Sequence, residues 1–138
     1  MSAIGLDTNV ISELVRLKPE PKVVKFLSAC EEPIVSVIVF HEIAYGIERL
    51  RDANKKTQLE LYLQGVKELY REQIVDVGIA LAELAGRLRG RASRSGWVLS
   101  EVDSLIAATA LEKGAKLATR NIADFERLPI SLVDPWSN

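Results

Sequence analysis

AIGLDTNVISELVRL, residues 3–17, is the stretch of sequence that decides the fold. Its first four residues, 3–6, are small or apolar and predict a short buried strand. The pattern of residues 9–17 is helical, and Pro19 stops it. Asp7 stands at the junction, directly after the strand. A strand that passes through a short junction into a helix begins a β–α–β unit, which favours an α/β fold with a parallel sheet.

The same alternation of short apolar runs and longer helical patterns continues to the end of the chain. Further strands are predicted at 33–37, 74–77, 115–119 and 130–133, and further helices at 21–29, 38–52, 55–71, 79–94 and 101–113. Pro21 suits a first helical turn, and Gly114 suits a helix end. We therefore predict a three-layer α/β/α sandwich with a parallel central sheet of four to five strands. Residues 1–138 are expected to form a single domain.

Composition narrows the class of protein. No run of about 20 apolar residues is present, so we expect no membrane span, and the N-terminus does not resemble a signal peptide. The single cysteine, Cys30, excludes an internal disulfide and favours a reducing cytoplasm. The net charge of −1 does not indicate nucleic-acid binding, although a local basic stripe could still bind nucleic acid. Two basic runs lie within 49–56 and 87–94. Each is either a solvated helix surface or a surface that contacts phosphates or an acidic partner.

Four acidic residues follow predicted strands or begin predicted helices. Asp7 follows the first strand, Glu42 lies in the first turns of helix 38–52, Asp103 lies in the first turn of helix 101–113, and Asp124 comes shortly after the fourth strand. Sites in open parallel sheets form beyond the carboxyl ends of the strands. A carboxylate cluster without histidine or cysteine suits Mg²⁺ or Mn²⁺ better than Zn²⁺. Such a cluster should also raise at least one carboxyl pKa.

Helix capping is the competing interpretation for three of these acids. Asp7 is a favoured N-cap residue by itself. Ser100-Glu101-Val102-Asp103 matches a capping box, and Asn121-Ile122-Ala123-Asp124 permits a similar arrangement. Capping at each position would be independent, whereas a shared metal site explains all four placements together.

Glu42 has no such alternative, because Val39 rather than a capping residue stands three positions before it. It could instead share a solvated stripe with Tyr45 and Arg49. His41-Glu42 also begins a zinc-protease motif, but that motif needs a second histidine where Tyr45 stands, so we reject it.

Together the motifs resemble those of PIN-domain toxins of the VapC/FitB type. The opening LDTNVISE of residues 6–13 resembles the first signature, EIAYG of 42–46 the second and DSLIAATA of 103–110 the third. TRN of 119–121 with DF of 124–125 resembles the fourth, and DPW of 134–136 is similar to the family's ending. One departure is Val39, where relatives often carry a threonine that can cap the helix.

The resemblance implies a metal-dependent endoribonuclease that hydrolyses RNA phosphodiester bonds and is the toxin of a type II toxin–antitoxin pair. Its cofactor would be Mg²⁺, with Mn²⁺ as a substitute. Its partners would be RNA, with tRNA as a candidate, a cognate antitoxin and a second copy of the chain, for which the apolar side chains of 55–71 could form the surface.

The resemblance also assigns the site. The catalytic and metal-binding acids map onto Asp7, Glu42, Asp103 and Asp124. Asp7 and Asp103 are the first-choice ligands, while some relatives carry the fourth acid at the position of Asn121. The supporting side chains are Thr8, Asn9, Thr119 and Asn121. Whether one ion or two bind stays open.

Two other functions stay open alongside the toxin ribonuclease. One is a structure-specific DNA nuclease, because metal–carboxylate chemistry does not itself distinguish the sugar. The other is a non-catalytic PIN-like subunit of an antitoxin–DNA regulatory complex, against which the complete acidic set argues.

Overall fold

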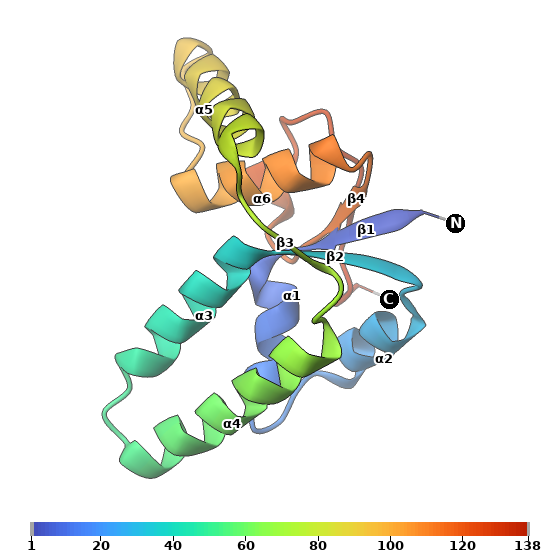
Figure 1. The fold of residues 1–138 in the computed structure, drawn as a ribbon. Coiled ribbons are helices and arrows are strands. Elements are labelled where there is room, and N and C mark those ends of the chain that lie inside the picture. The colour runs from blue at the N-terminus through green and yellow to red at the C-terminus, as the bar shows by residue number, and fades with distance from the viewer. Residues whose placement is uncertain (1, 138) are drawn as a thin grey trace.

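Five parallel strands form one sheet in the order β3-β2-β1-β4-β5 in the computed structural model, which describes residues 2–137 (Figure 1). The strands are β1 Ala3–Leu6, β2 Glu32–Ser36, β3 Ile74–Val75, β4 Lys116–Ala118 and β5 Leu132–Val133. β1 is the central strand, and its Gly5 lies opposite Ile34 of β2 and Leu117 of β4. All four pairings are parallel, as predicted.

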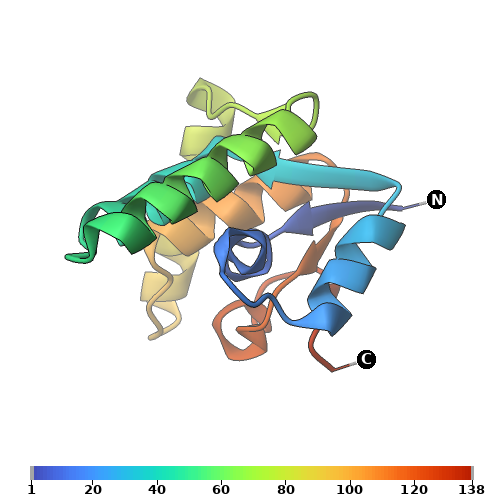
Figure 2. The same ribbon diagram turned by 90° about the horizontal axis from the view of Figure 1, so that it is seen from below.

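Helices cover both faces of this sheet. α1 Thr8–Ser12, α2 Pro21–Ala29, α3 Val37–Glu48 and α4 Ala53–Leu69 lie on one side, and α5 Ile79–Arg94 and α6 Glu101–Glu112 lie on the other (Figures 1 and 2). α6 packs directly on β1, β2 and β4, and α5 packs on α6. A short helix, α7 Ile122–Phe125, follows β4. This arrangement confirms the predicted three-layer sandwich.

The core is densest where α6 meets the central strand. Leu6, Leu117 and Ala107 are almost completely buried there. A Cβ atom at Gly5 would lie 3.3 Å from the Cβ of Ala110, so the missing side chain lets α6 approach β1 closely. Because α6 carries Asp103 and β1 leads into Asp7, this contact sets the spacing between two of the predicted acids.

Several element ends differ from the predictions for local reasons. The predicted helix 9–17 begins at Thr8 and tightens into a 3-10 turn, η1 Glu13–Val15. Glu13 is buried there because its carboxylate accepts hydrogen bonds from the backbone of Glu20 and the guanidinium of Arg16, at 2.8 and 2.7 Å. The strands predicted at 74–77 and 130–133 are two residues long, and α7 was not predicted.

Most of the apolar side chains of α4 pack against the core of the same chain. Leu59, Leu63 and Val66 are buried in the core, whereas Leu61 and Leu69 are exposed. The surface that we expected residues 55–71 to offer to a second copy is therefore largely occupied by the chain's own packing. In the part of the chain that the structure describes, no helix is long and apolar enough to cross a membrane.

Candidate active site

Asp7 lies at the junction of the two central strands. Its backbone N–H donates to the carbonyl of Ala118, which ties the end of β1 to the end of β4 (3.0 Å). One carboxylate oxygen caps α1 by accepting from the N–H of Thr8 (2.8 Å). The other accepts from the hydroxyl of Thr119 (2.7 Å). Capping is thus correct for one oxygen, and the second is held by a residue 112 positions away.

Thr119 is the hub of a polar network around Asp7. It is fully buried, and its hydroxyl donates to Asp7 while accepting from the backbone N–H of Asn121 (2.9 Å) and the amide of Asn9 (3.5 Å). Asn9 in turn accepts from the N–H of Arg120 (3.3 Å). A hydroxyl has one donor and two acceptor positions, so this one is fully used. The network fixes the direction of the Asp7 carboxylate.

Asp103 lies in the first turn of α6. Its backbone N–H donates to the hydroxyl of Ser100, which caps the helix as predicted (3.1 Å). This bond uses the backbone of Asp103, so capping leaves its carboxylate available. Burial first, and then the negative charges of Asp7, Asp124 and Glu42, together raise the pKa of Asp103 from an ordinary 3.8 to about 6, against a hydrogen bond from Ser100 that lowers it.

The same repulsion acts at Asp7. Burial raises its pKa most, the hydrogen bonds from Thr119 and Thr8 oppose that rise, and the charge of Asp124 adds to it. The structure therefore brings all four predicted acids close enough for their charges to interact around Asp103. The pKa values of Asp7 and Asp103 are raised mainly by burial, and repulsion among the carboxylates adds to the rise.

Glu42 approaches this group from α3. Ser36 caps α3 by accepting from the N–H of Ile38 (3.2 Å), so the helix begins before Val39 and needs no cap at that position. This places Glu42 in the second helical turn. Its carboxylate lies 2.9 Å from Nδ1 of His41, and its side chain is 33% exposed. The imidazole is more exposed than the carboxylate, so the pair connects the acidic cluster to solvent.

Asp124 lies on α7 and is exposed. Asn121 stands at the N-cap of α7 without a side-chain capping bond, so the proposed capping arrangement of 121–124 is not found. Instead, the N–H of Asn121 binds Thr119. Asn121 thus belongs to the supporting network, while Asp124 contributes a carboxylate at its edge.

The donors present suit a hard divalent cation. They are carboxylate oxygens and neutral hydroxyl or amide groups, with no cysteine or histidine in the group around Asp103 apart from the neighbour of Glu42. Within residues 2–137, no three acidic, histidine or cysteine side chains are already gathered closely enough to hold an ion.

Thr8 adds an independent indication beside Asp7. Its hydroxyl oxygen is buried and has no hydrogen-bond partner within the described residues. A buried unpaired hydroxyl is costly, and such groups commonly accompany a water or ion site. The residues at the ends of β1 and β4 therefore fit a Mg²⁺ or Mn²⁺ centre in their chemistry.

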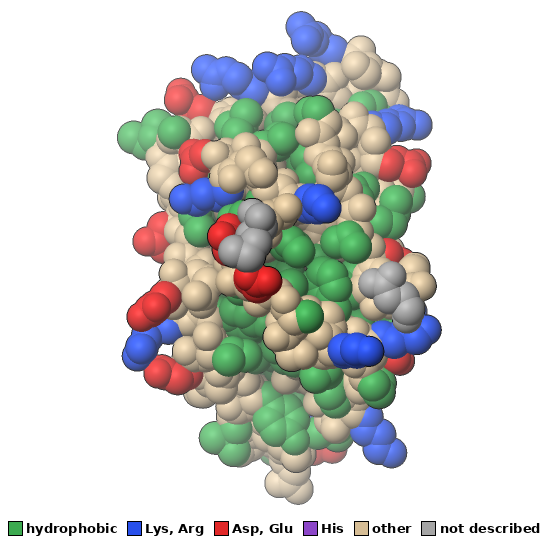
Figure 3. Space-filling model, turned by 90° about the vertical axis from the view of Figure 1, so that its right-hand side faces the viewer, with side chains coloured by type: hydrophobic (Ala, Val, Ile, Leu, Met, Phe, Trp, Pro, Cys, Tyr) green, Lys and Arg blue, Asp and Glu red, His purple; other side chains and the backbone are tan. Residues whose placement is uncertain are grey.

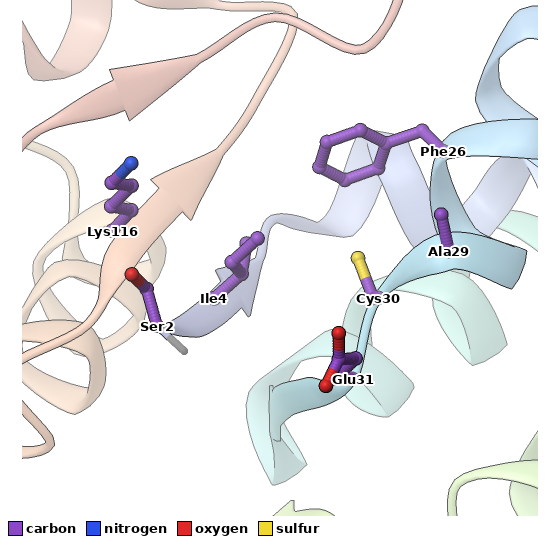
Figure 4. A pocket seen from close by; sticks show the side chains of 7 residues that line it. All are labelled: Ser2, Ile4, Phe26, Ala29, Cys30, Glu31 and Lys116. Atoms are coloured by element: carbon purple, nitrogen blue, oxygen red, sulfur yellow. The ribbon is translucent and has the colours of Figure 1, made fainter.

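Several cavities of the molecule lie away from the four acids. One of about 310 Å³ is lined by Ile4, Phe26, Cys30 and Lys116 and sits where β1 and β4 begin (Figure 4). Figure 3 shows this side of the molecule, opposite the acidic cluster, with hydrophobic side chains gathered in its middle. At the top of the same view, where α5 lies, Lys and Arg side chains gather; the arginines within 87–94 are exposed.

Two arginine–tryptophan pairs beside the acids were not foreseen. The guanidinium of Arg120 lies 5.1 Å from the centre of the Trp136 ring, and that of Arg127 lies 5.6 Å from the centre of the Trp97 ring. TRN and DPW were recognised as motifs, but nothing in their spacing indicates that they touch. Trp97 is half-buried, and the guanidinium of Arg127 lies over its ring.

The chain is similar to known proteins over nearly its whole length. The PIN domain family profile matches residues 4–130. The chain is 30% identical over 136 residues to "VapC ribonuclease Y4jK" of Sinorhizobium fredii, covering 96% of this chain and 97% of the relative. It is 32% identical over 136 residues to "Toxin FitB" of Neisseria gonorrhoeae, covering 96% and 98%. The crystal structure of FitAcB from Neisseria gonorrhoeae is similar with a TM-score of 0.86 at 31% identity, covering 98% and 99%.

Proposed function

This chain belongs to the PIN domain family, and from that membership we propose that it is a metal-dependent endoribonuclease, the toxin of a type II toxin–antitoxin pair. The observation that carries the proposal is the electrostatic interaction of four carboxylates around Asp103. Asp7, Glu42, Asp103 and Asp124 come from separate β–α units, and their charges interact around Asp103. The names of the relatives, ribonuclease and toxin, support the class of reaction and the biological role.

We assign roles from the contacts of each side chain. Asp7 and Asp103 would hold Mg²⁺ or Mn²⁺ most directly, because Asp7 is fixed by two hydrogen bonds and the charges of the other three acids act on Asp103. Asp124, on α7, would be a further carboxylate ligand of the ion. A bound divalent ion would polarise the phosphate oxygens and lower the pKa of water.

Glu42 is the group that we assign to proton transfer. Its carboxylate would accept a proton from the attacking water, and His41, whose Nδ1 lies 2.9 Å away, could take up that proton at Nδ1 and release one from Nε2 to solvent. Thr119 and Asn9 would not react, but they would keep Asp7 aimed at the ion.

The substrate and partners follow from the same proposal. RNA is the expected substrate, and tRNA is the first RNA to test. A cognate antitoxin would hold the enzyme inactive, and the chain would work in the cytoplasm as a homodimer. A protein encoded beside this gene should form a stable complex with the chain and suppress its toxicity when the two are co-expressed.

Cleavage assays test the enzyme. The purified chain is incubated with labelled RNA and with DNA, each with Mg²⁺, with Mn²⁺ or with excess chelator. We expect metal-dependent cuts in RNA, and a loss of at least about a hundredfold in rate for Glu42→Gln. Arg71→Ala is the control, because Arg71 is exposed and paired with Glu68 at the end of α4. Cleavage confined to DNA would replace the proposal with a DNA nuclease, and no cleavage of either would refute it.

A further inference from the structure

Arg120 and Arg127 stand on either side of the helix that carries Asp124. Arg120 lies immediately before Asn121, the N-cap of α7, and Arg127 follows the helix by two residues. The four residues of α7 rise about 6 Å at about 1.5 Å per residue, so the helix separates the two positions by a distance of that order. That length corresponds to a few phosphates of one nucleic-acid strand, which are spaced by about 3.4 Å along a helix axis.

Each of these arginines lies over a tryptophan from a distant segment. The guanidinium–ring distances are 5.1 Å for Arg120 and Trp136 and 5.6 Å for Arg127 and Trp97. Stacking uses the flat face of a guanidinium and leaves its N–H edge free to donate, in the fork geometry that matches a phosphate. Within residues 2–137 neither arginine forms an ion pair, whereas Arg16 and Arg71 pair with acids.

Backbone structure holds both tryptophans in place. Trp97 follows Gly96, whose φ of 84° lets the chain turn at the end of α5, and the N–H of Trp97 donates to the carbonyl of Ala92 (3.0 Å). The N–H of Trp136 donates to the carboxylate of Asp134 (2.9 Å). The rings are therefore supports fixed before any ligand arrives, and an arginine resting on one loses less freedom on binding.

The negative charge of the site is a reason for positive side chains to lie beside it. A cluster of four carboxylates attracts a cation but repels a polyanion, and the chain as a whole carries a net charge of −1. A phosphodiester strand can lie across such a cluster only if positive groups beside it offset the repulsion. The arginine–tryptophan pairs place positive charge next to Thr119 and Asp124, on the two sides of α7.

We propose that Arg120 and Arg127, each supported by a tryptophan, bind RNA phosphates on either side of the phosphodiester bond that is cut. This inference rests on the proposed nuclease function and adds to it the surface along which the strand lies. The contacts go to the backbone, so they position the RNA and do not read its sequence.

Salt-dependent binding tests the inference. A fluorescein-labelled single-stranded oligouridylate is titrated with protein that carries Asp103→Asn, in Mg²⁺ and at several salt concentrations, and Kd is measured by anisotropy. The slope of log Kd against log salt should fall in magnitude by about 0.7 for each of Arg120→Ala and Arg127→Ala. Arg120→Lys and Arg127→Lys should keep the slope, because the charge remains, but bind several-fold more weakly because the stacked fork is lost.

Arg71→Ala in the same background is the matched control, since it removes an exposed arginine at the end of the sheet where β3 begins. Its slope should equal that of the parent. Slopes unchanged by Arg120→Ala and Arg127→Ala, or lowered equally by Arg71→Ala, would overturn the inference. So would failure of the parent to bind the oligonucleotide. Cleavage of RNA by the wild-type chain is measured separately, so the proposed function can stand when this inference falls.

Discussion

Replacing Asp103 with asparagine should make the metal-free protein more stable. The substitution keeps the shape of the side chain and the backbone hydrogen bond to Ser100, and it removes one negative charge. Asp103 has a pKa of about 6 against an ordinary 3.8, so at neutral pH it is ionised at a cost that burial and the charges of Asp7, Asp124 and Glu42 impose. Most substitutions of a helix-capping acid have the opposite sign.

The magnitude follows from the pKa of Asp103. A tenfold change in proton affinity is worth about 1.4 kcal/mol, so the full cost of ionisation is about 3 kcal/mol. The side chain is only half-buried, and solvent screening reduces this to about 1–2 kcal/mol. Losing a negative charge at the start of α6 costs about 0.3–1 kcal/mol. The net gain of about 1 kcal/mol corresponds to a rise in Tm of roughly 3–5 °C for a chain of this size.

The assay is a thermal melt at neutral pH and low salt, followed by circular dichroism in excess chelator. Glu101→Gln is the matched control, because Glu101 lies in the same first turn of α6 and is exposed. It should lower Tm slightly, through the loss of its favourable position at the helix start. Adding Mg²⁺ at ten times Kd should then raise the stability of the wild type by about 1.4 kcal/mol, and that of Asp103→Asn by less.

Two results would refute this reasoning. If Asp103→Asn melts below the wild type in chelator, as Glu101→Gln should, repulsion within the cluster does not limit stability. If Mg²⁺ shifts the Tm of both proteins equally, Asp103 does not hold the ion.

Three further predictions follow from the contacts around the site. The raised pKa of Asp103 means that its ionisation destabilises the fold, so stability in chelator should fall as pH rises from 3.8 through about 6 and then level off; urea melts across this range should show a smaller fall in Asp103→Asn, where the raised pKa of Asp7 still contributes. Thr119→Val removes the hydroxyl that binds Asp7, so it should cost about 1–3 kcal/mol in urea melts and slow RNA cleavage. Thr119→Ser should restore much of the stability and of the cleavage rate. Equal cleavage rates for the two variants would contradict the role of the hydroxyl. Gly5→Ala should push α6 away from β1, which should lower stability by about 1–3 kcal/mol and reduce the rate of cleavage. Gly65→Ala is the control: its new Cβ would meet no atom within 4 Å, so it should stabilise the protein by about 0.5–1 kcal/mol. An unchanged stability of Gly5→Ala would show that α6 can move freely.

The strand–helix alternation and the acids at its junctions could be predicted from sequence because both depend on neighbouring residues. Apolar runs such as 3–6 mark strands, and Asp7 follows directly. The end of β2 was placed one residue too late, which made α3 look uncapped when Ser36 caps it. α7 was missed because four residues carry too little periodicity to indicate a helix.

Long-range contacts account for the rest of what sequence could not predict. The hydroxyl of Thr119 reaches Asp7 across 112 positions, and Trp97 meets Arg127 only after α6 and β4 have been placed between them. Likewise, the pattern of α4 shows which residues are apolar, but not whether they are buried within one chain or between two. Leu63 and Val66 proved to face the chain's own core.

The bond between Asp7 and Thr119 also has a consequence for synthesis. Asp7 is made long before the partner that orients it, Thr119, and long before the last of the four acids, Asp124. A ribosome adds about 5–20 residues per second, so several seconds pass before the second half of the acidic cluster exists. A nascent chain that ends before β4 lacks Thr119 and Asp124, so under the proposed function we expect it to be inactive. Because β1 pairs with β4, the site can be completed only after β4 has been made.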